Sequence, residues 1–146
     1  MKDLRTSIAA LDAQPVALSD ALADWSAEAY ERCEAAHCTL QWDHQSALSE
    51  RPLSPHTKAM LEAVVRELIS NALKHASPSR LTLSFTLQGE RLLLQLRHDG
   101  TVSAPEGWKD GYGMRNLRSR LQEKGGSLVA RAEGAELHFQ AETPLP

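Results

Sequence analysis

The sequence has little of what marks several common protein classes. It contains no long uncharged apolar run and no signal-peptide pattern, so we expect neither a membrane span nor an export signal, and a cytoplasmic location follows. The formal charge of −3 gives no broad basic field, so charge does not indicate nucleic-acid binding. Glycine and proline are too few to suggest disorder, and the six histidines form no metal-ligand pair. These absences predict a folded domain without a structural metal.

Cysteine is also scarce, and the two that are present form no recognisable motif. Cys33 and Cys38 stand at a predicted helix-to-strand junction, have no second pair at zinc-ligand spacing, and are interpreted as buried reduced thiols. The chain has 146 residues, 42% of them hydrophobic and 24% charged, which suits one globular domain. We expect residues 15–146 to form that domain and residues 1–14 to be the tail of an upstream helix or a linker.

Periodicity in the sequence predicts about three helices and about five strands. Ser19 is the predicted N-cap of a helix that runs to about Ala36, and Ser54 or Thr57 can cap the next one. Alternating apolar residues predict a hairpin after it, and Gly125-Gly126 end the last helix. The predicted strands are 38–42, 81–87, 91–97, 127–132 and 135–141. This order predicts an α+β fold, a two-layer sandwich with the helices on one face of a mixed, mostly antiparallel sheet.

The stretch RELISNALKHA, residues 66–76, combines a packing face with a polar stripe. In a helix, Glu67, Asn71 and Lys74 fall at i, i+4 and i+7, so a carboxylate, an amide and an ammonium share one side. The other side carries the apolar residues Leu61, Val65, Leu68, Ile69, Ala72, Leu73 and Ala76. Such a stripe is either a solvated helix face or part of a binding site, and the stretch alone does not decide between them.

Two glycine-containing segments favour a binding site. In DGYGMRNLRSRL, residues 110–121, Gly111 and Gly113 precede a helix, so backbone N–H groups can approach a phosphate without a side chain in between. The arginines of this segment are Arg115, Arg118 and Arg120. They add positive charge, although a solvated helix face explains most of them equally well. In RHDGT, residues 97–101, a strand ends where a polar side chain can contact a base edge and Gly100 lets a ligand come close.

The order and spacing of these three segments, followed by EKGGSL, resemble the ATP-binding catalytic domain of sensor histidine kinases. The resemblance is narrower to the nitrate-sensor and desaturase-sensor type, within the superfamily of gyrase, heat-shock chaperone, kinase and mismatch-repair ATPases, and covers about Ser19 to the C-terminus. It implies a Bergerat-type ATPase fold with ATP and Mg²⁺ as cofactors. It also implies transfer of the γ-phosphoryl group of ATP to a histidine, followed by relay to a response regulator.

The resemblance assigns roles to individual residues. Asn71 matches the residue that coordinates Mg²⁺, and Glu67 matches the acidic residue that acts as, or orients, the base for the acceptor histidine. Lys74 and His75 match positions that contact the nucleotide phosphates. With residues 102–110 as a lid, the resemblance places a further group of residues at the nucleotide, namely Gly111, Tyr112, Gly113 and Met114.

One departure from the family affects base recognition. In the family's first glycine box, D-x-G-x-G, the leading aspartate accepts a hydrogen bond from the adenine amino group, whereas His98 holds that position here and Val102 replaces the last glycine. A neutral histidine has one ring acceptor, so His98 can still contact adenine, more weakly than a carboxylate does. Asp99 can replace the missing carboxylate only if the strand end slips or bulges, because neighbours in a strand face opposite ways. We expect ATP still to bind, with His98, Asp99 and Gly100 beside it.

A second departure concerns the phosphate acceptor. In the family this histidine lies on a dimerising helical hairpin that precedes the domain, and none of the six histidines here lies on such a hairpin. The chain is therefore expected to bind nucleotide as a monomer without phosphorylating itself. We expect it to be one part of a longer homodimeric sensor, with the hairpin and a response regulator as its partners.

Three other interpretations stay open. His98 and Val102 also fit a degenerate module that senses nucleotide or serves as a scaffold without transferring phosphate. A domain that binds no nucleotide is the second. The third is a stand-alone serine kinase of the anti-sigma type, which shares the fold and lacks the hairpin; the run GMRNLRSRL followed by GGSL argues against it.

Overall fold

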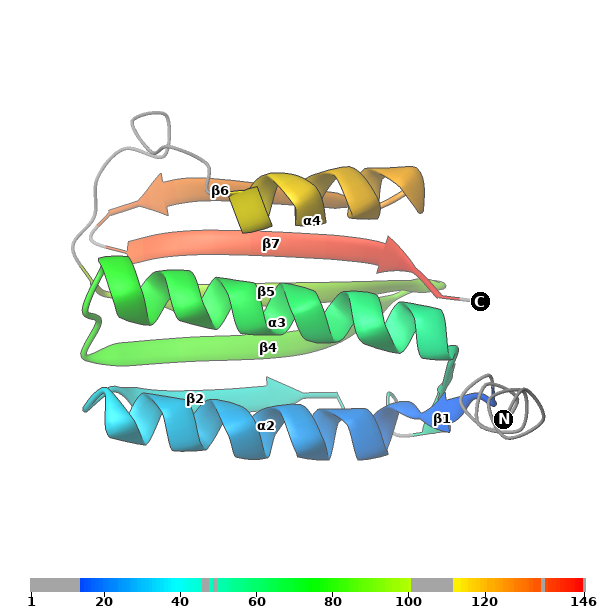
Figure 1. The fold of residues 1–146 in the computed structure, drawn as a ribbon, viewed down its shortest axis with the longest axis horizontal. Helices are drawn as coiled ribbons and strands as arrows, with labels where there is room; N and C mark the ends of the chain where they lie inside the picture. The colour runs from blue at the N-terminus through cyan, green and yellow to red at the C-terminus, as the bar shows by residue number, and fades with distance from the viewer. Residues whose placement is uncertain (1–13, 46–47, 49, 101–111, 135, 146) are drawn as a thin grey trace, which may run out of the picture.

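A layer of helices covers one face of a mixed sheet in the computed structural model (Figure 1). The structure describes residues 14–45, 48, 50–100, 112–134 and 136–145, so the predicted tail lies almost entirely outside it. The helices are α2 (Leu18–Ala35), α3 (Pro55–His75) and α4 (Tyr112–Glu123). The strands are β1 (Val16–Ala17), β2 (Thr39–His44), β3 (Pro52–Leu53), β4 (Arg80–Gln88), β5 (Arg91–His98), β6 (Ser127–Glu133) and β7 (Glu136–Pro144). The predicted two-layer α+β fold is confirmed.

The main sheet has five strands in the order β2-β4-β5-β7-β6. β2 pairs with β4 in parallel, and every other neighbouring pair is antiparallel, as the predicted mixed sheet requires. The sequence did not predict β1 and β3, which pair with each other over two residues each. Two residues are too few to show the alternation by which a strand is detected in a sequence.

Apolar residues at alternate positions of the strands face the helices. On β4, Leu81, Leu83 and Phe85 are fully buried. The ring of Phe85 packs against Trp25 of α2 and Trp42 of β2, with ring centroids 6.2 and 5.1 Å away. Trp42 thus packs against the core. These contacts join α2 to the sheet edge and leave α3 over the centre of the sheet (Figure 1).

The starts of the helices depend on local and tertiary hydrogen bonds. Ser54 caps α3 as predicted, because its hydroxyl oxygen accepts a hydrogen bond from the N–H of Thr57 at 3.1 Å. The prediction that Ser19 caps α2 is wrong, since the helix begins at Leu18 without a side-chain cap. The N–H of Leu18 donates to the carbonyl oxygen of Arg51 at 2.9 Å, so the β1–β3 connection supplies a partner that the sequence does not reveal.

Cys33 and Cys38 are buried free thiols, as predicted. Burial raises the pKa of the Cys38 thiol to about 11, so it stays protonated at neutral pH. None of the helices among the described residues is both long and apolar enough to cross a membrane.

Candidate functional site

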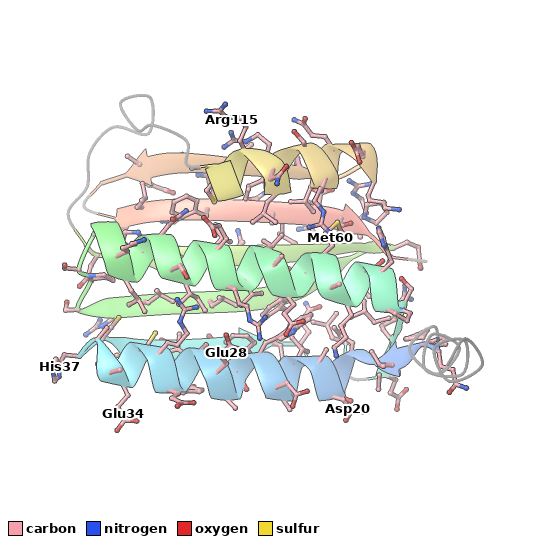
Figure 2. The ribbon with its side chains drawn as sticks, in the orientation of Figure 1. Asp20, Glu28, Glu34, His37, Met60 and Arg115 are labelled. Carbon is pink, nitrogen blue, oxygen red and sulfur yellow. The ribbon has the colours of Figure 1, made fainter. Side chains whose placement is uncertain are left out.

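Helix α3 lies between α2 and α4 and therefore has two flanks (Figure 1). The α2-facing flank, defined as Glu62, Arg66 and Ser70, is bonded within the chain. Arg66 forms paired hydrogen bonds to Glu28 of α2, with the closest N–O distances at 2.9 Å, and also reaches Glu62 at 3.1 Å. Ser70 accepts a hydrogen bond from Arg32 of α2. Figure 2 shows Glu28 on the side of α2 toward α3.

The α4-facing flank, defined as Glu67, Asn71 and Lys74, extends from the solvent side of the helix, where Lys74 lies, toward the side of α4. At about 100° per residue, Asn71 is rotated by about 140° from Arg66 around the helix axis. Glu67 and Asn71 are half-buried and Lys74 is exposed. Among the described residues no side chain forms a hydrogen bond or ion pair with any of the three. A carboxylate, an amide and an ammonium thus stand on one flank with their bonding capacity unused.

The predicted apolar side of α3 anchors these polar groups. All but one of its members are buried, and Leu73 is partly buried against the core. A helix held along its whole apolar side cannot rotate, so the polar flank has a fixed direction. The prediction of a packing face opposite a polar stripe is therefore confirmed, whereas what the stripe binds stays a prediction.

Helix α4 begins beside the C-terminal half of α3 and runs in the opposite direction (Figure 1). Met114 is 5% exposed and packs in the core with Leu117 and Leu121. Tyr112 and Gly113 form the first turn of α4, where backbone N–H groups are unpaired within a helix. The predicted Gly111 and the lid 102–110 lie outside the described residues, as does the side chain of His75.

The arginines of α4 do not gather at its start. Arg115 is exposed and, in Figure 2, projects from the edge of the molecule away from α3. Arg118 donates a hydrogen bond from its Nε to the carbonyl oxygen of Leu128 at 3.2 Å, which ties α4 to β6. Arg120 is exposed in the second half of the helix. Arg115 and Arg120 therefore belong to a solvated helix face, and Arg118 has a structural contact.

His98 is the last residue of β5, on the central strand of the sheet, and faces the helix layer together with Leu94 and Leu96. It is 2% exposed, and its ring stacks on Phe139 of β7 with centroids 6.3 Å apart. Its Nδ1 accepts a hydrogen bond from the N–H of Gly100 at 3.2 Å. Desolvation lowers the pKa of His98, although the nearby carboxylates of Asp99 and Glu136 oppose this, so the ring is neutral at pH 7.

Asp99 faces the other way and is engaged by the start of β4. Its carboxylate accepts hydrogen bonds from the Ser79 hydroxyl at 2.6 Å, the Ser79 N–H at 3.0 Å and the Arg80 N–H at 2.9 Å. The Ser79 hydrogen bond is the main cause that holds the pKa of Asp99 below its ordinary value. The pairing of β5 with β4 and β7 is regular through His98. Sequence reasoning missed this role of Asp99, for which its spacing from Ser79 gave no signal.

Gly100 brings the end of β5 against the end of α3. A Cβ atom at this position would lie 2.5 Å from the carbonyl oxygen of Ala76, the C-cap residue of α3, so only glycine fits. Asn71 stands five residues before Ala76, which is about 7.5 Å along the helix axis. The structure thus brings the end of β5, the polar flank of α3 and the start of α4 into the same half of the molecule, the half that contains the C-terminal part of α3 (Figure 1).

Solved structures with this arrangement define the class of fold. The catalytic domain of the histidine kinase ThkA superposes with a TM-score of 0.73 at 12% identity, over 90% of this chain and 95% of that one. The Acinetobacter baumannii histidine kinase AdeS gives 0.72 at 16% identity, over 90% of this chain and 66% of that one. The chain has the fold of a histidine kinase catalytic domain.

Sequence comparison makes the likeness more specific. The chain is 35% identical to the Salmonella typhimurium signal transduction histidine-protein kinase/phosphatase UhpB over 82 residues, which is 56% of this chain and 16% of UhpB. It is 24% identical to the Bacillus subtilis sensor histidine kinase LiaS over 108 residues, 73% of this chain and 29% of LiaS. No family model matches the sequence. The chain spans less than a third of the length of each of these relatives. The resemblance to the catalytic domain of sensor histidine kinases is confirmed.

Proposed function

We propose that this chain binds ATP with Mg²⁺ between α3 and the start of α4, as the catalytic domain of a two-component sensor kinase. The observation that carries the proposal is the polar flank of α3, Glu67, Asn71 and Lys74, which lies beside the first turn of α4 and has no partner in the part of the chain that the structure describes. The opposite flank of the same helix bonds its charged groups within the chain. Residues 15–146 would form this domain in a longer, cytoplasmic part of the parent protein.

The donor set fits a magnesium nucleotide. Mg²⁺ prefers oxygen ligands and keeps several waters, so the amide oxygen of Asn71 together with phosphate oxygens would suffice to hold it. Lys74 would offset negative charge on the phosphates, and the unpaired N–H groups of the first turn of α4 would face them. Bound ATP and Mg²⁺ would supply an activated γ-phosphoryl group for in-line transfer.

Glu67 would act on the acceptor rather than on the nucleotide. In the proposed reaction the bond between the γ-phosphorus and the β,γ-bridging oxygen breaks, a phosphorus–nitrogen bond to a histidine forms, and ADP leaves. Glu67 is half-buried three and four residues along the helix from Ser70 and Asn71 and has no partner among the described residues, so its carboxylate is available to orient that histidine or take its proton. The acceptor hairpin and the response regulator would come from the parent kinase and a separate protein.

The test compares neighbouring residues of α3 that belong to different flanks. Binding of ATP to the full chain is measured by calorimetry with and without Mg²⁺, for Asn71→Ala and for the control Ser70→Ala. We expect Asn71→Ala to lose the magnesium-dependent part of binding, a drop of about 100-fold, with an unchanged melting temperature. Ser70→Ala should keep the wild-type affinity.

Two results would contradict the proposal. Equal affinity of Asn71→Ala and wild type for Mg-ATP would remove the metal-binding role of this flank. A melting temperature that falls in Asn71→Ala without nucleotide, together with unchanged binding, would assign the amide a structural role instead.

A further inference from the structure

The hydrogen bond at His98 fixes which ring nitrogen carries the proton. Nδ1 accepts from the N–H of Gly100 at 3.2 Å, so it must present a lone pair. The ring is almost completely buried, at 2% exposure, which disfavours a second proton. The single proton of the neutral ring therefore lies on Nε2. His98 therefore offers a hydrogen-bond donor at the position where the kinase family that the sequence resembles has an aspartate, which is an acceptor.

The Nε2–H group has no acceptor among the residues that the structure describes. The one hydrogen bond of the His98 ring within this part of the chain is the one that Nδ1 accepts from Gly100. A buried donor without an acceptor lowers the stability of the state that contains it, and a ligand oxygen that accepts its hydrogen bond restores the loss. His98 thus has the properties of a residue that completes its bonding with a ligand.

The surroundings of His98 suit a flat purine ring. The imidazole stacks on Phe139 at an interplanar angle of 26°, which keeps its plane fixed. Gly100 packs against Ala76, which brings the end of β5 directly against the end of α3. If the phosphates lie at Asn71 and the first turn of α4, the end of β5 is the part of the described structure where the family resemblance places the base.

We propose that His98 makes this site selective for a purine with a carbonyl oxygen at C6, as in inosine and guanosine triphosphates, over adenosine triphosphate. The proposal rests on the nucleotide-binding function proposed above and changes only the base that the site prefers. Adenine carries an amino group at C6, which donates hydrogen bonds, and two donors that face each other repel. Hypoxanthine and guanine carry O6 there, which accepts one. A site whose donor faces the C6 substituent discriminates against a base that can only donate at that position.

Mg-ATP and Mg-ITP are the matched pair of probes, because they differ only at the C6 substituent and the adjacent ring proton. Affinities of the full chain for both are measured by calorimetry at pH 7.5, for wild type and for His98→Asp. We expect the wild type to bind ITP at least about 10-fold more tightly than ATP. In His98→Asp we expect the opposite preference, with ATP bound more tightly than ITP. Wild-type preference for ATP, equal affinities, or an unchanged ratio in His98→Asp would each overturn the proposal.

Two further measurements protect the test against misfolding of His98→Asp. His98→Gln carries an amide that can either donate or accept, so its two affinities should differ by less than about 3-fold. The ¹⁵N chemical shifts of the His98 ring in wild type should show a protonated Nε2 and an unprotonated Nδ1, and the reverse pattern would remove the premise. Failure of the proposed function has a different signature, since neither triphosphate would then bind wild type or any variant, and Asn71→Ala would change nothing.

Discussion

The two flanks of α3 carry similar side chains and use them in opposite ways. On the α2-facing flank, Arg66 is bonded to Glu28 and Glu62, and Ser70 is bonded to Arg32. On the α4-facing flank the polar groups have no partner among the described residues. A polar group that is satisfied within the chain maintains the fold, and one that is unsatisfied beside a helix start is available to a ligand. The partners of a side chain, rather than its type, separate the two roles.

The end of β5 repeats this contrast within two neighbouring residues. Asp99 accepts three hydrogen bonds from Ser79 and Arg80, which fix its carboxylate at the start of β4. The Nδ1 atom of His98 accepts one hydrogen bond from Gly100, and its Nε2 atom has none within the described ranges. The residue that resembles the family's carboxylate in type is thus bonded to the start of β4, whereas the residue at the family's position has one ring nitrogen without a partner among the described residues.

Reversing the charge of Lys74 should give the largest effect. Lys74→Glu removes an attraction to the expected phosphates and replaces it with a repulsion. Both changes weaken binding, so we expect a loss of affinity for Mg-nucleotide of about 100-fold. The melting temperature without nucleotide should not change, because the side chain is exposed and has no partner among the described residues. Calorimetry and thermal unfolding measure the two quantities.

Lys58→Glu is the matched control for that variant. Lys58 lies in the first turns of the same helix, about 24 Å along the axis from Lys74. Its reversal changes the net charge by the same amount, so a general electrostatic effect on an anionic ligand would appear in both variants. Equal losses of affinity in the two would break the contrast between the flank and the rest of α3.

Asp99→Asn should affect folding rather than binding. The amide keeps one acceptor oxygen but loses the charge that strengthens three hydrogen bonds, so we expect a loss of about 1 kcal/mol, after allowance for solvent exposure. Denaturant unfolding measures it, and the ratio of ATP to ITP affinity should equal that of wild type. A changed ratio would mean that Asp99 contacts the base, and the contrast with His98 would fail.

The sequence predicts positions along an element better than the partners of a side chain. The 3.6-residue period placed Glu67, Asn71 and Lys74 on one side of α3 and its apolar residues on the other, because helix geometry is local. The hydrogen bonds of Arg66 join it to Glu28, 38 residues away, and depend on how two helices pack. The missed start of α2 has the same cause, since Leu18 bonds to Arg51. The family resemblance supplied what spacing could not, namely the expectation of a nucleotide.

Removing Arg66 tests the other flank. Arg66→Ala breaks the contacts to Glu28 and Glu62, which are partly exposed to solvent, so we expect a loss of only about 0.5 kcal/mol in the free energy of unfolding. Affinity for Mg-nucleotide should stay at the wild-type value. A double-mutant cycle with Glu28→Ala isolates the pair, and a coupling energy of zero would show that this flank does not stabilise the fold through the ion pair.

The smallest effect should be the pH dependence of the same pair. The hydrogen bond from Arg66 holds the pKa of Glu28 below its ordinary value. A carboxyl group with a lowered folded-state pKa stabilises the fold above its unfolded pKa, about 4.3, and this contribution is lost as the pH falls through the folded value. Glu28→Gln should therefore be less stable than wild type by a few tenths of a kcal/mol at pH 7 and equal to it near pH 2.

The control for this measurement is Glu31→Gln, on an exposed position of α2 that has no recorded partner among the described residues. Thermal unfolding of the three proteins at pH 7 and near pH 2 gives the two differences. Asp99 titrates in the same range, but it is common to all three proteins and cancels. A difference for Glu28→Gln that persists at low pH would mean that side-chain packing, and not the ion pair, joins α2 to α3. The α2-facing flank would then resemble the α4-facing one in having charges that the fold itself does not use.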